Sequence, residues 1–251
     1  MRAMILAAGL GTRLRPLTND RPKALVEIAG HTLLEITLRR LASFGVHEVI
    51  VNVHHFADMV AEYLRKNNNF GMRIEISRED ILLDTGGGLK KAACFFLETP
   101  GQPPQTESSF ILHNVDVLST IDLARMLQSH HETKTLATLA VQDRKTSRYL
   151  LFDGDSRLCG RSKGNEAPEF VRSTEKQYAL AFSGVHVISP RLLRMITEEG
   201  VFSIIDTYLR LAAQGESIMA FRADQYYWRD LGKPENLAQA AQDVERHLVQ
   251  L

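Results

Sequence analysis

The sequence predicts an α/β fold with a doubly wound, mostly parallel sheet and a smaller mixed part after residue 135. Short apolar runs typical of buried parallel strands alternate with amphipathic segments typical of helices. The first such run, residues 3–8 (AMILAA), is continuously apolar and ends at a glycine, as a strand buried on both faces does. Strands that alternate with helices at this spacing favour βαβ units, in which the strands lie parallel.

The first half of the chain carries clear start and stop signals. Thr32 can cap a helix that places Leu34, Leu38 and Leu41 on one face, and Gly45 can end it. The other elements expected here are strands at 48–53, 72–76 and 109–117 and helices at 56–67 and 89–97.

After residue 135 strands predominate. We expect strands at 135–141, 148–153 and 181–188, and helices at 203–215 and 234–250, the last with Pro234 in its first turn. Residues 160–177 are polar and lack a clear period, which favours an exposed connection or a loop over a site. Residues 98–108, rich in Pro, Gly and Ser, are expected to form a surface loop.

The composition excludes several classes of protein. Among 251 residues, 30 Lys and Arg balance 30 Asp and Glu, so no global field recruits nucleic acid or an anionic membrane. No stretch reaches the roughly 18 apolar residues of a membrane span, and the apolar start is too short for a signal peptide. Cys94 and Cys159 lack metal-binding or disulfide spacing. We therefore expect a cytoplasmic protein with no membrane or nucleic-acid partner.

A glycine-rich turn follows the first expected strand, in GLGTRLRPLTNDRPKALVEIAG (residues 9–30). Such a turn exposes backbone N–H groups that can hold phosphates. A dinucleotide fingerprint would need glycine where Leu14 stands, and the P-loop pattern has no match. What remains is a turn at Gly9 and Gly11, followed by Arg13 and, further on, Lys23. This pattern predicts a phosphate site with two fixed cations.

This stretch resembles the signature of the nucleotidyltransferases that activate sugar 1-phosphates: GxGTRLxPLT after a strand, then PKxL and an apolar residue before glycine. The segments GLGTRLRPLT and PKALVEIAG supply every part of it. The resemblance implies transfer of a nucleoside monophosphate from an NTP to a sugar 1-phosphate, with release of pyrophosphate and with Mg²⁺ as cofactor. Two unit charges 4 Å apart repel by about 4 kcal/mol at an effective dielectric near 20, so two such anions need fixed cations to meet.

The resemblance also implies four catalytic residues. Arg13 is expected to contact the leaving pyrophosphate and Lys23 the phosphates at the reacting centre. Asp116, at the end of an expected strand, and Asp230, late in the chain, correspond to the family's two Mg²⁺ ligands.

Two neighbours of these aspartates depart from the family pattern. Val115 stands where glycine is usual and is expected to narrow the approach of the backbone to a ligand. Arg229 replaces the usual valine before the second aspartate. The aromatic residues just before it, Tyr226, Tyr227 and Trp228, are interpreted as packing or sheet residues.

Further residues are implied to bind the two substrates. DTGGG (residues 84–88) resembles the family loop that packs against the nucleobase, and three glycines ahead of the expected helix predict close backbone approach. FSGVHVI resembles the strand with a glycine under the sugar, which is Gly184 here, while Asn114 is expected to reach a sugar or ribose hydroxyl. The implied nucleotide-binding residues are Ala7, Ala8, Gly9, Gly11, Thr12, Arg13, Lys23, Thr85, Gly86 and Gly87.

The resemblance extends over nearly the whole chain and predicts a single domain, 1–251. Within it, 1–134 is expected to bind mainly nucleotide and 135–233 mainly sugar, with a C-terminal helix at 234–251. From the length we expect no acetyltransferase domain of the kind that longer relatives carry.

The choice of substrates stays open between several family members. The signature, the DTGGG loop and the length most resemble the uridylyltransferases that act on N-acetylmuramic acid 1-phosphate in cell-wall recycling, with UTP as donor. Mannose- and heptose-1-phosphate guanylyltransferases share much of the pattern, often with glycine in place of Ala8. A catalytically weak nucleotide-sensing paralogue is the third alternative: Val115 favours it, and the four intact catalytic residues oppose it.

Overall fold

The computed structural model describes residues 1–97, 108–164 and 166–251. Of the surface loop expected at 98–108, all but Ser108 therefore lies outside the described residues. The strands are β1 (Arg2–Leu6), β2 (Glu27–Ile28), β3 (His31–Thr32), β4 (Glu48–Val53), β5 (Arg73–Arg78), β6 (Phe110–Asn114), β7 (Val117–Ser119), β8 (Ala137–Gln142), β9 (Arg148–Asp153), β10 (Leu158–Lys163), β11 (Glu169–Phe170), β12 (Gln177–Ile188), β13 (Ile218–Arg222) and β14 (Trp228–Asp230).

Seven α-helices and four short 3-10 helices complete the described part of the chain. The α-helices are α1 (Leu33–Ser43), α2 (Ala57–Lys66), α3 (Asp84–Lys91), α4 (Cys94–Leu97), α5 (Leu123–Thr133), α6 (Ile204–Ala213) and α7 (Pro234–Glu245). The 3-10 helices are η1 (Thr12–Leu14), η2 (Lys23–Leu25), η3 (Asn68–Gly71) and η4 (Pro190–Met195). None of the helices in these ranges is long and apolar enough to cross a bilayer.

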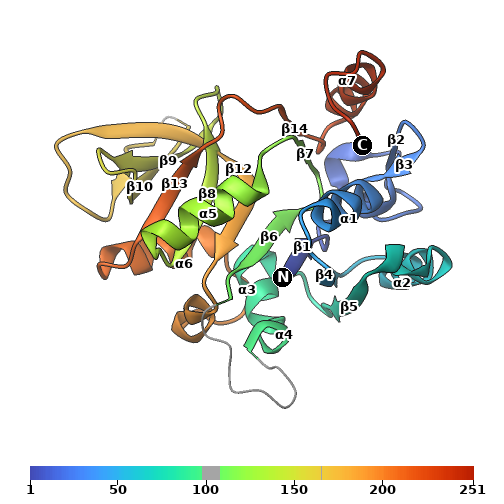
Figure 1. The fold of residues 1–251 in the computed structure, drawn as a ribbon, viewed down its shortest axis with the longest axis horizontal. Helices are drawn as coiled ribbons and strands as arrows, with labels where there is room; N and C mark the ends of the chain where they lie inside the picture. The colour runs from blue at the N-terminus through green and yellow to red at the C-terminus, as the bar shows by residue number, and fades with distance from the viewer. Residues whose placement is uncertain (98–107, 165) are drawn as a thin grey trace.

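One sheet of ten strands runs through the molecule, in the order β11-β10-β9-β12-β6-β1-β4-β5, with β8 against β12 and β13 against β8. The strands β6, β1, β4 and β5 are parallel, whereas the long strand β12 is antiparallel to β6, β8 and β9. Figure 1 shows the parallel strands β1, β4 and β5 on one side and β8, β9 and β10 on the other, with β6 and β12 between them. The predicted fold, a mostly parallel central sheet with a smaller mixed part, is confirmed.

Helices cover both faces of the sheet, as a doubly wound fold requires. Successive strand residues point to opposite faces, and β1 shows this directly: Ala3 and Ile5 belong to one buried apolar cluster and Met4 to another. The first cluster includes residues of α1, α2, α5 and α7, and the second includes residues of α3, α4 and α6. The central strand β1 is therefore buried by apolar side chains on both of its faces.

The helix boundaries follow the local signals. The Thr32 hydroxyl accepts a hydrogen bond from the Glu35 N–H at 3.1 Å and caps α1, which ends just before Gly45, and α7 begins at Pro234. The expected helix at 89–97 is wrong in its bounds, because α3 starts earlier, at Asp84, and takes the three glycines into its first two turns. A separate short helix, α4, follows it.

Two strand predictions also need correction. The expected strand at 109–117 breaks into β6 and β7, so that Val115 and Asp116 lie in a turn between them. The polar segment at 160–177 contains the end of β10, the short strand β11 and the start of β12. These strands were missed because they form an exposed, mostly polar extension of the sheet, where hydrophobic periodicity carries no signal.

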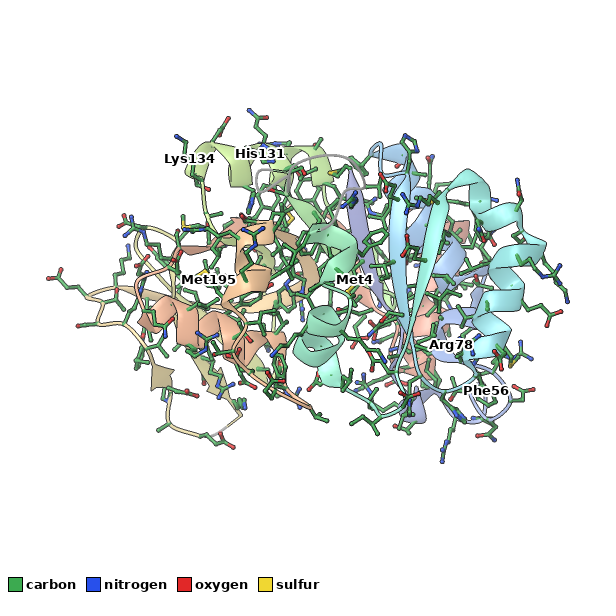
Figure 2. The ribbon with its side chains drawn as sticks, turned by 90° about the horizontal axis from the view of Figure 1, so that it is seen from below. Met4, Phe56, Arg78, His131, Lys134 and Met195 are labelled. Atoms are coloured by element: carbon green, nitrogen blue, oxygen red, sulfur yellow. The ribbon has the colours of Figure 1, made fainter. Side chains whose placement is uncertain are left out.

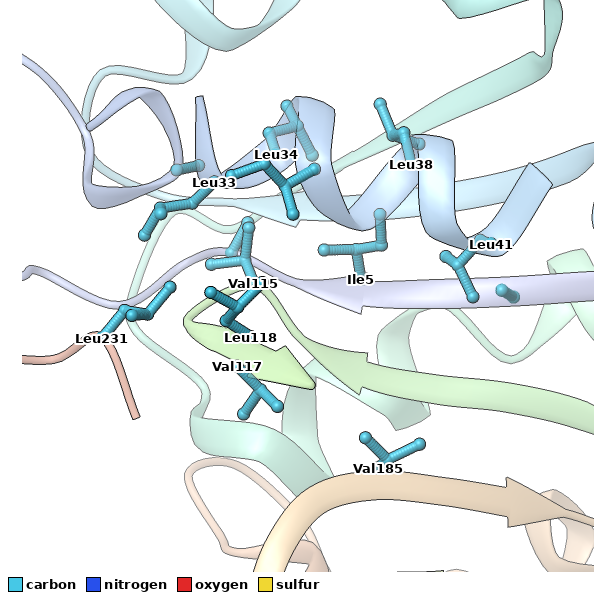
Figure 3. Packing of buried hydrophobic residues seen from close by; sticks show 14 of the residues in the cluster. Ile5, Leu33, Leu34, Leu38, Leu41, Val115, Val117, Leu118, Val185 and Leu231 are labelled. Carbon is cyan, nitrogen blue, oxygen red and sulfur yellow. The ribbon is translucent and has the colours of Figure 1, made fainter. Parts of the chain in front are cut away.

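Val115 packs into the interior. Its side chain is 4% exposed and belongs to the apolar cluster on the α1 face, where Figure 3 shows it between Leu118 and α1. Its N–H donates to the carbonyl of Leu6 at the end of β1 at 3.1 Å. The valine that replaces the family's glycine thus fills the core and does not narrow the approach of a ligand.

We predict that Val115→Ala destabilises the protein without increasing its activity. Removing two buried methyl groups should lower the free energy of unfolding by about 2 kcal/mol, which denaturation in urea would measure. The catalytic efficiency, kcat/KM, should stay unchanged. A rise in kcat/KM would instead mean that the valine does obstruct the ligand.

We predict that stability falls as the pH drops below about 6.5. Burial lowers the pKa of His113 and His130 to about 4 and that of His186 to about 3. Between those values and the ordinary pKa near 6.5, the unfolded chain binds more protons than the folded chain, so each histidine contributes a slope of up to about 1.4 kcal/mol per pH unit.

Denaturation of the wild type and of His130→Gln between pH 7 and 5 would test this. The variant should lose stability less steeply with falling pH, because one of the three depressed groups is gone. Identical slopes in the two proteins would contradict the assignment for His130.

Candidate active site

The candidate site lies at the carboxyl ends of the parallel strands. From β1 the chain moves to β4 and β5 on one side and then returns to β6 on the other side, so neighbouring connections diverge between β1 and β6. Open α/β sheets bind ligands at such switch points. Figure 2 shows Arg78, the last residue of β5, near Phe56, which follows β4, and Arg78 pairs with Asp58 of α2 at 2.6 Å. The strands thus end at one common edge.

A cavity of about 430 Å³ opens at this edge. Its volume falls within the range of ordinary small-molecule sites. Five residues implied by the sequence line it: Ala8, Gly9, Thr85, Asn114 and Asp116. The others that line it are Leu6, Asn52, Glu79, Leu82, Asp84 and Val201.

Asn52 and Glu79 join β1, β4 and α3 beneath this cavity, and both were missed by the sequence reasoning. The Asn52 side chain accepts from the N–H of Ala7 at 2.7 Å and donates to Glu79 at 2.7 Å. The second Glu79 oxygen accepts from the N–H of Leu83 at 3.0 Å. A lone amide and carboxylate in the sequence carry no such signal, because their pairing depends on the neighbouring strands β4 and β5.

The three glycines of α3 are explained by protein contacts. A methyl group at Gly86 would lie 2.4 Å from the Phe202 ring, and one at Gly87 would lie 2.5 Å from the Gly200 carbonyl. The N–H groups of Gly86 and Gly87 both donate to the Phe202 carbonyl, at 3.0 and 3.3 Å. At Gly88 a methyl group would meet Glu79 at 2.7 Å. The close approach that the sequence predicts therefore occurs, and what approaches is the chain at 200–204 and Glu79.

Lys23 and Asp116 come together from distant parts of the chain. The Lys23 ammonium forms a short ion pair with the Asp116 carboxylate, and Lys23 itself is only 8% exposed. The turn before η1 lies close to the lysine: Gly11 has φ 64°, and a methyl group on it would lie 3.1 Å from the Lys23 Cβ. Thr12 and Arg13 follow on η1 and are exposed.

Asp230 reaches the same place through a two-stranded sheet. Strand β14 pairs with β7, Asp230 opposite Val117, and the N–H of Leu231 donates to the Asp116 carbonyl at 2.8 Å. The Asp230 carboxylate accepts from the N–H of Gly232 at 2.7 Å. A methyl group at Gly232 would lie 2.6 Å from Nη2 of Arg13 and 2.8 Å from Oδ1 of Asp230. Asp230 therefore lies near Arg13, and the segment that carries it is hydrogen-bonded to the turn that carries Asp116, the partner of Lys23.

Arg229 anchors this strand to the C-terminal helix. Its guanidinium pairs with Asp243 of α7 at 2.7 Å, and the Tyr227 hydroxyl donates to the same carboxylate at 2.6 Å. Asp243 is 4% exposed, and these hydrogen bonds hold its pKa below the usual range although burial opposes them. Arginine in place of the usual valine thus tethers α7 to the strand that carries Asp230.

The two residues expected on the sugar side also lie together. Gly184 has φ 75°, and a methyl group on it would lie 2.9 Å from the side-chain nitrogen of Asn114. The ladder between β12 and β8 shifts register between Phe182 and His186, around this glycine. Because Asn114 lines the cavity, Gly184 lies directly beside it.

Asp116 and Asp230 are the carboxylates that would hold a metal ion at this site. The described residues contain no cluster of three or more His, Cys, Asp or Glu that could hold a metal ion. Mg²⁺ does not need one, since it is commonly held by one or two carboxylates together with substrate phosphates and water. Asp116 and Asp230, on adjacent segments beside the cationic Lys23 and Arg13, suit such a site.

An α/β sheet with cations and carboxylates at its switch point suits the binding of an anionic ligand such as a phosphate. Comparison with known sequences shows that the chain belongs to the nucleotidyl transferase family, whose model matches residues 2–247. The class predicted from the signature, a sugar-1-phosphate nucleotidyltransferase, is confirmed.

Individual proteins agree with this membership. The chain is 37% identical over 245 residues to N-acetylmuramate alpha-1-phosphate uridylyltransferase of Caulobacter vibrioides, covering 93% of this chain and 92% of that one. It is 28% identical over 249 residues to mannose-1-phosphate guanylyltransferase of Mycobacterium tuberculosis, but spans only 64% of its length, with 97% of this chain covered. Among solved structures, HddC from Yersinia pseudotuberculosis complexed with GMP-PN shares the fold, with a TM-score of 0.74, 24% identity, and 97% and 99% of the two chains covered.

We predict that Gly232→Ala lowers kcat/KM by about 100-fold with little loss of stability. The added methyl group must displace Arg13 or Asp230, and a shift of about 1 Å at a reacting centre costs on that order. Steady-state kinetics and thermal unfolding would measure both effects.

Gly154→Ala is the matched control, since a methyl group at Gly154 meets nothing within 4 Å. That variant should keep wild-type kinetics. Wild-type activity in Gly232→Ala would show that the contact between Arg13, Gly232 and Asp230 is not needed.

Proposed function

We propose that this enzyme transfers a uridylyl group from UTP to N-acetylmuramic acid 1-phosphate, with release of pyrophosphate. The observation that carries the chemistry is the placement of Lys23 on Asp116, which lines the cavity, and of Arg13 near Asp230, on a segment hydrogen-bonded to Asp116. The substrate choice is supported by the Caulobacter vibrioides relative, which is 37% identical over nearly its full length. Cytoplasmic cell-wall recycling is the proposed setting.

In the proposed reaction a phosphate oxygen of the sugar 1-phosphate attacks the α-phosphorus of UTP. The new P–O bond forms as the bond from the α-phosphorus to the bridging oxygen breaks, and its electron pair leaves with pyrophosphate. Lys23 offsets negative charge at the reacting centre, and Arg13 offsets it on the leaving group. The Asp116 carboxylate holds the Lys23 ammonium in place before substrate arrives.

We propose Mg²⁺ as the cofactor, held by Asp116 and Asp230. Within the described part of the chain, each carboxylate keeps one oxygen that accepts no protein hydrogen bond, since Lys23 contacts one oxygen of Asp116 and Gly232 one oxygen of Asp230. When bound, the ion supplies additional charge neutralisation between the two phosphate groups.

We assign the nucleotide to the first part of the domain, 1–134, and the sugar mainly to 135–233, with the helix at 234–251 as a support. On the nucleotide side, Gly9 has open space around it and Thr85 lines the cavity. On the sugar side, Gly184 lies close to Asn114, because a methyl group on it would come within 2.9 Å of the Asn114 side-chain nitrogen. The nucleotide-binding set we propose is Ala7, Ala8, Gly9, Gly11, Thr12, Arg13, Lys23, Thr85, Gly86 and Gly87, the last two through their placement of α3 against 200–204.

A guanylyltransferase acting on mannose or heptose 1-phosphate is the second candidate, favoured by the Mycobacterium tuberculosis relative at 28% identity. Pyrophosphate release with Mg²⁺, over UTP, dTTP, GTP, CTP and ATP against muramic, glucosamine, glucose, mannose and heptose 1-phosphates, would decide between them. We expect the strongest signal with UTP and N-acetylmuramic acid 1-phosphate. A stronger signal with GTP and mannose or heptose 1-phosphate would favour the second candidate, and nucleotide binding without any turnover would favour a sensor.

We predict that Asp116→Asn and Asp230→Asn each lower kcat by about 100-fold or more while the fold is kept. Each substitution removes one of the two carboxylates proposed to hold Mg²⁺, and with it the positive charge that the ion would supply to the phosphates. Asp155→Asn, at an exposed turn after β9, is the control and should turn over normally. Normal turnover in either site variant would contradict the proposed metal ligands.

A further inference from the structure

Arg144 is a partly buried cation near the sugar side that the reaction proposed above does not use. It lies on the loop after β8, and its guanidinium carbon stands 3.6 Å from the centre of the Trp228 ring. Its Nη2 donates to the Phe182 carbonyl at 2.6 Å, and Trp228 Nε1 donates to the Ser183 carbonyl at 2.8 Å. Arg144 and Trp228 thus stack on each other, and each donates a hydrogen bond to β12 just before Gly184.

Two strand relationships place this guanidinium on the side of β14 that carries Asp230 and next to the part of β12 that leads to Gly184. Side chains two residues apart on a strand share a face, so Trp228 and Asp230 point the same way, whereas Arg229 points to the opposite face and pairs with Asp243. On β12, Phe182 and Ser183 lead directly into Gly184, which contacts Asn114 of the cavity. Arg144 therefore contacts both the strand that carries Asp230 and the strand that carries Gly184.

Arg144 lacks a carboxylate partner within the described ranges. No Asp or Glu of those ranges lies within ion-pair distance of it, its Nε is buried without a hydrogen bond, and Nη1 has no protein acceptor there. Arg229, on the same strand as Trp228, shows the contrasting arrangement, because its guanidinium is paired with Asp243. A half-buried guanidinium loses hydration, and an anion that binds it recovers that free energy.

We propose that Arg144, held flat on Trp228, binds a carboxylate carried by the acceptor sugar and selects for it. This rests on the proposed function, because N-acetylmuramic acid differs from N-acetylglucosamine by a lactyl ether that adds one carboxylate. A planar guanidinium can bind a carboxylate through two parallel hydrogen bonds, and stacking on an aromatic ring fixes its plane. Arg13 and Lys23 serve the phosphates, so Arg144 is free for this second negative group.

The test compares two acceptors, N-acetylmuramic acid 1-phosphate and N-acetylglucosamine 1-phosphate, with UTP in wild type and in Arg144→Gln. Charge-assisted hydrogen bonds are typically worth a factor of about 10 to 100. We expect Arg144→Gln to lower kcat/KM for the carboxylated sugar by that factor, mainly through KM. Activity on the sugar without the carboxylate should be retained, which also shows that the variant is folded.

Two further variants sharpen the result. Arg144→Lys keeps the charge and loses the planar fork, so it should lose less than Arg144→Gln with the muramic acceptor. Lys145→Gln removes the exposed charge next along the chain and should change neither acceptor. Equal losses for both acceptors in Arg144→Gln would overturn the inference, since Arg144 would then serve the shared phosphate or the fold.

Failure of the inference can be told apart from failure of the proposed function. A wild-type enzyme that shows no preference for the carboxylated sugar overturns the inference and leaves nucleotidyl transfer in place. If no nucleotide and sugar pair releases pyrophosphate, the proposed function fails. Equilibrium binding of N-acetylmuramic acid 1-phosphate to wild type and Arg144→Gln then decides the inference, and equal affinities overturn it.

Discussion

The ion pair between Lys23 and Asp116 is the interaction on which the rest of the site depends. It joins η2, in the signature segment after β1, to the turn after β6. These two segments are far apart in sequence, but the strands β1 and β6 that precede them are neighbours in the sheet. Lys23 is only 8% exposed, and a buried ammonium needs a negatively charged partner, which Asp116 provides. In the same turn, the backbone carbonyl of Asp116 accepts a hydrogen bond from the N–H of Leu231, which positions the neighbouring Asp230 and its carboxylate.

Close packing of backbone sets the walls of the site. The glycines of α3 allow this helix to press against the chain at 200–204 and against Glu79, and Gly232 allows Arg13 and Asp230 to approach each other. Val115 shows the opposite solution, since its side chain fills the core below the turn that carries Asp116. Glycine thus occurs where two backbone segments pack closely, and valine occurs where a side chain fills the core.

The C-terminal helix α7 is anchored to β14, the strand that carries Asp230 and Trp228. Asp243 of α7 holds Arg229, and the opposite face of the same short strand presents Trp228 and Asp230. One strand of three residues therefore carries a structural anchor on one face and an aromatic platform with a carboxylate on the other. This division explains how an arginine can replace the usual valine without disturbing Asp230.

The sequence by itself determined the fold class and the family signature, because apolar periodicity and a long motif are local properties, and the family resemblance predicted Arg13, Lys23, Asp116 and Asp230 as catalytic residues. It also predicted the Thr32 cap and the start of α7 at Pro234. Only the tertiary structure decided what the glycines at 86–88 touch, where Val115 points, and that Asn52 pairs with Glu79. Those facts depend on which strands become neighbours. The stacking of Arg144 on Trp228 is of the same kind, because it needs the loop after β8 to meet β14, and no local pattern encodes that meeting.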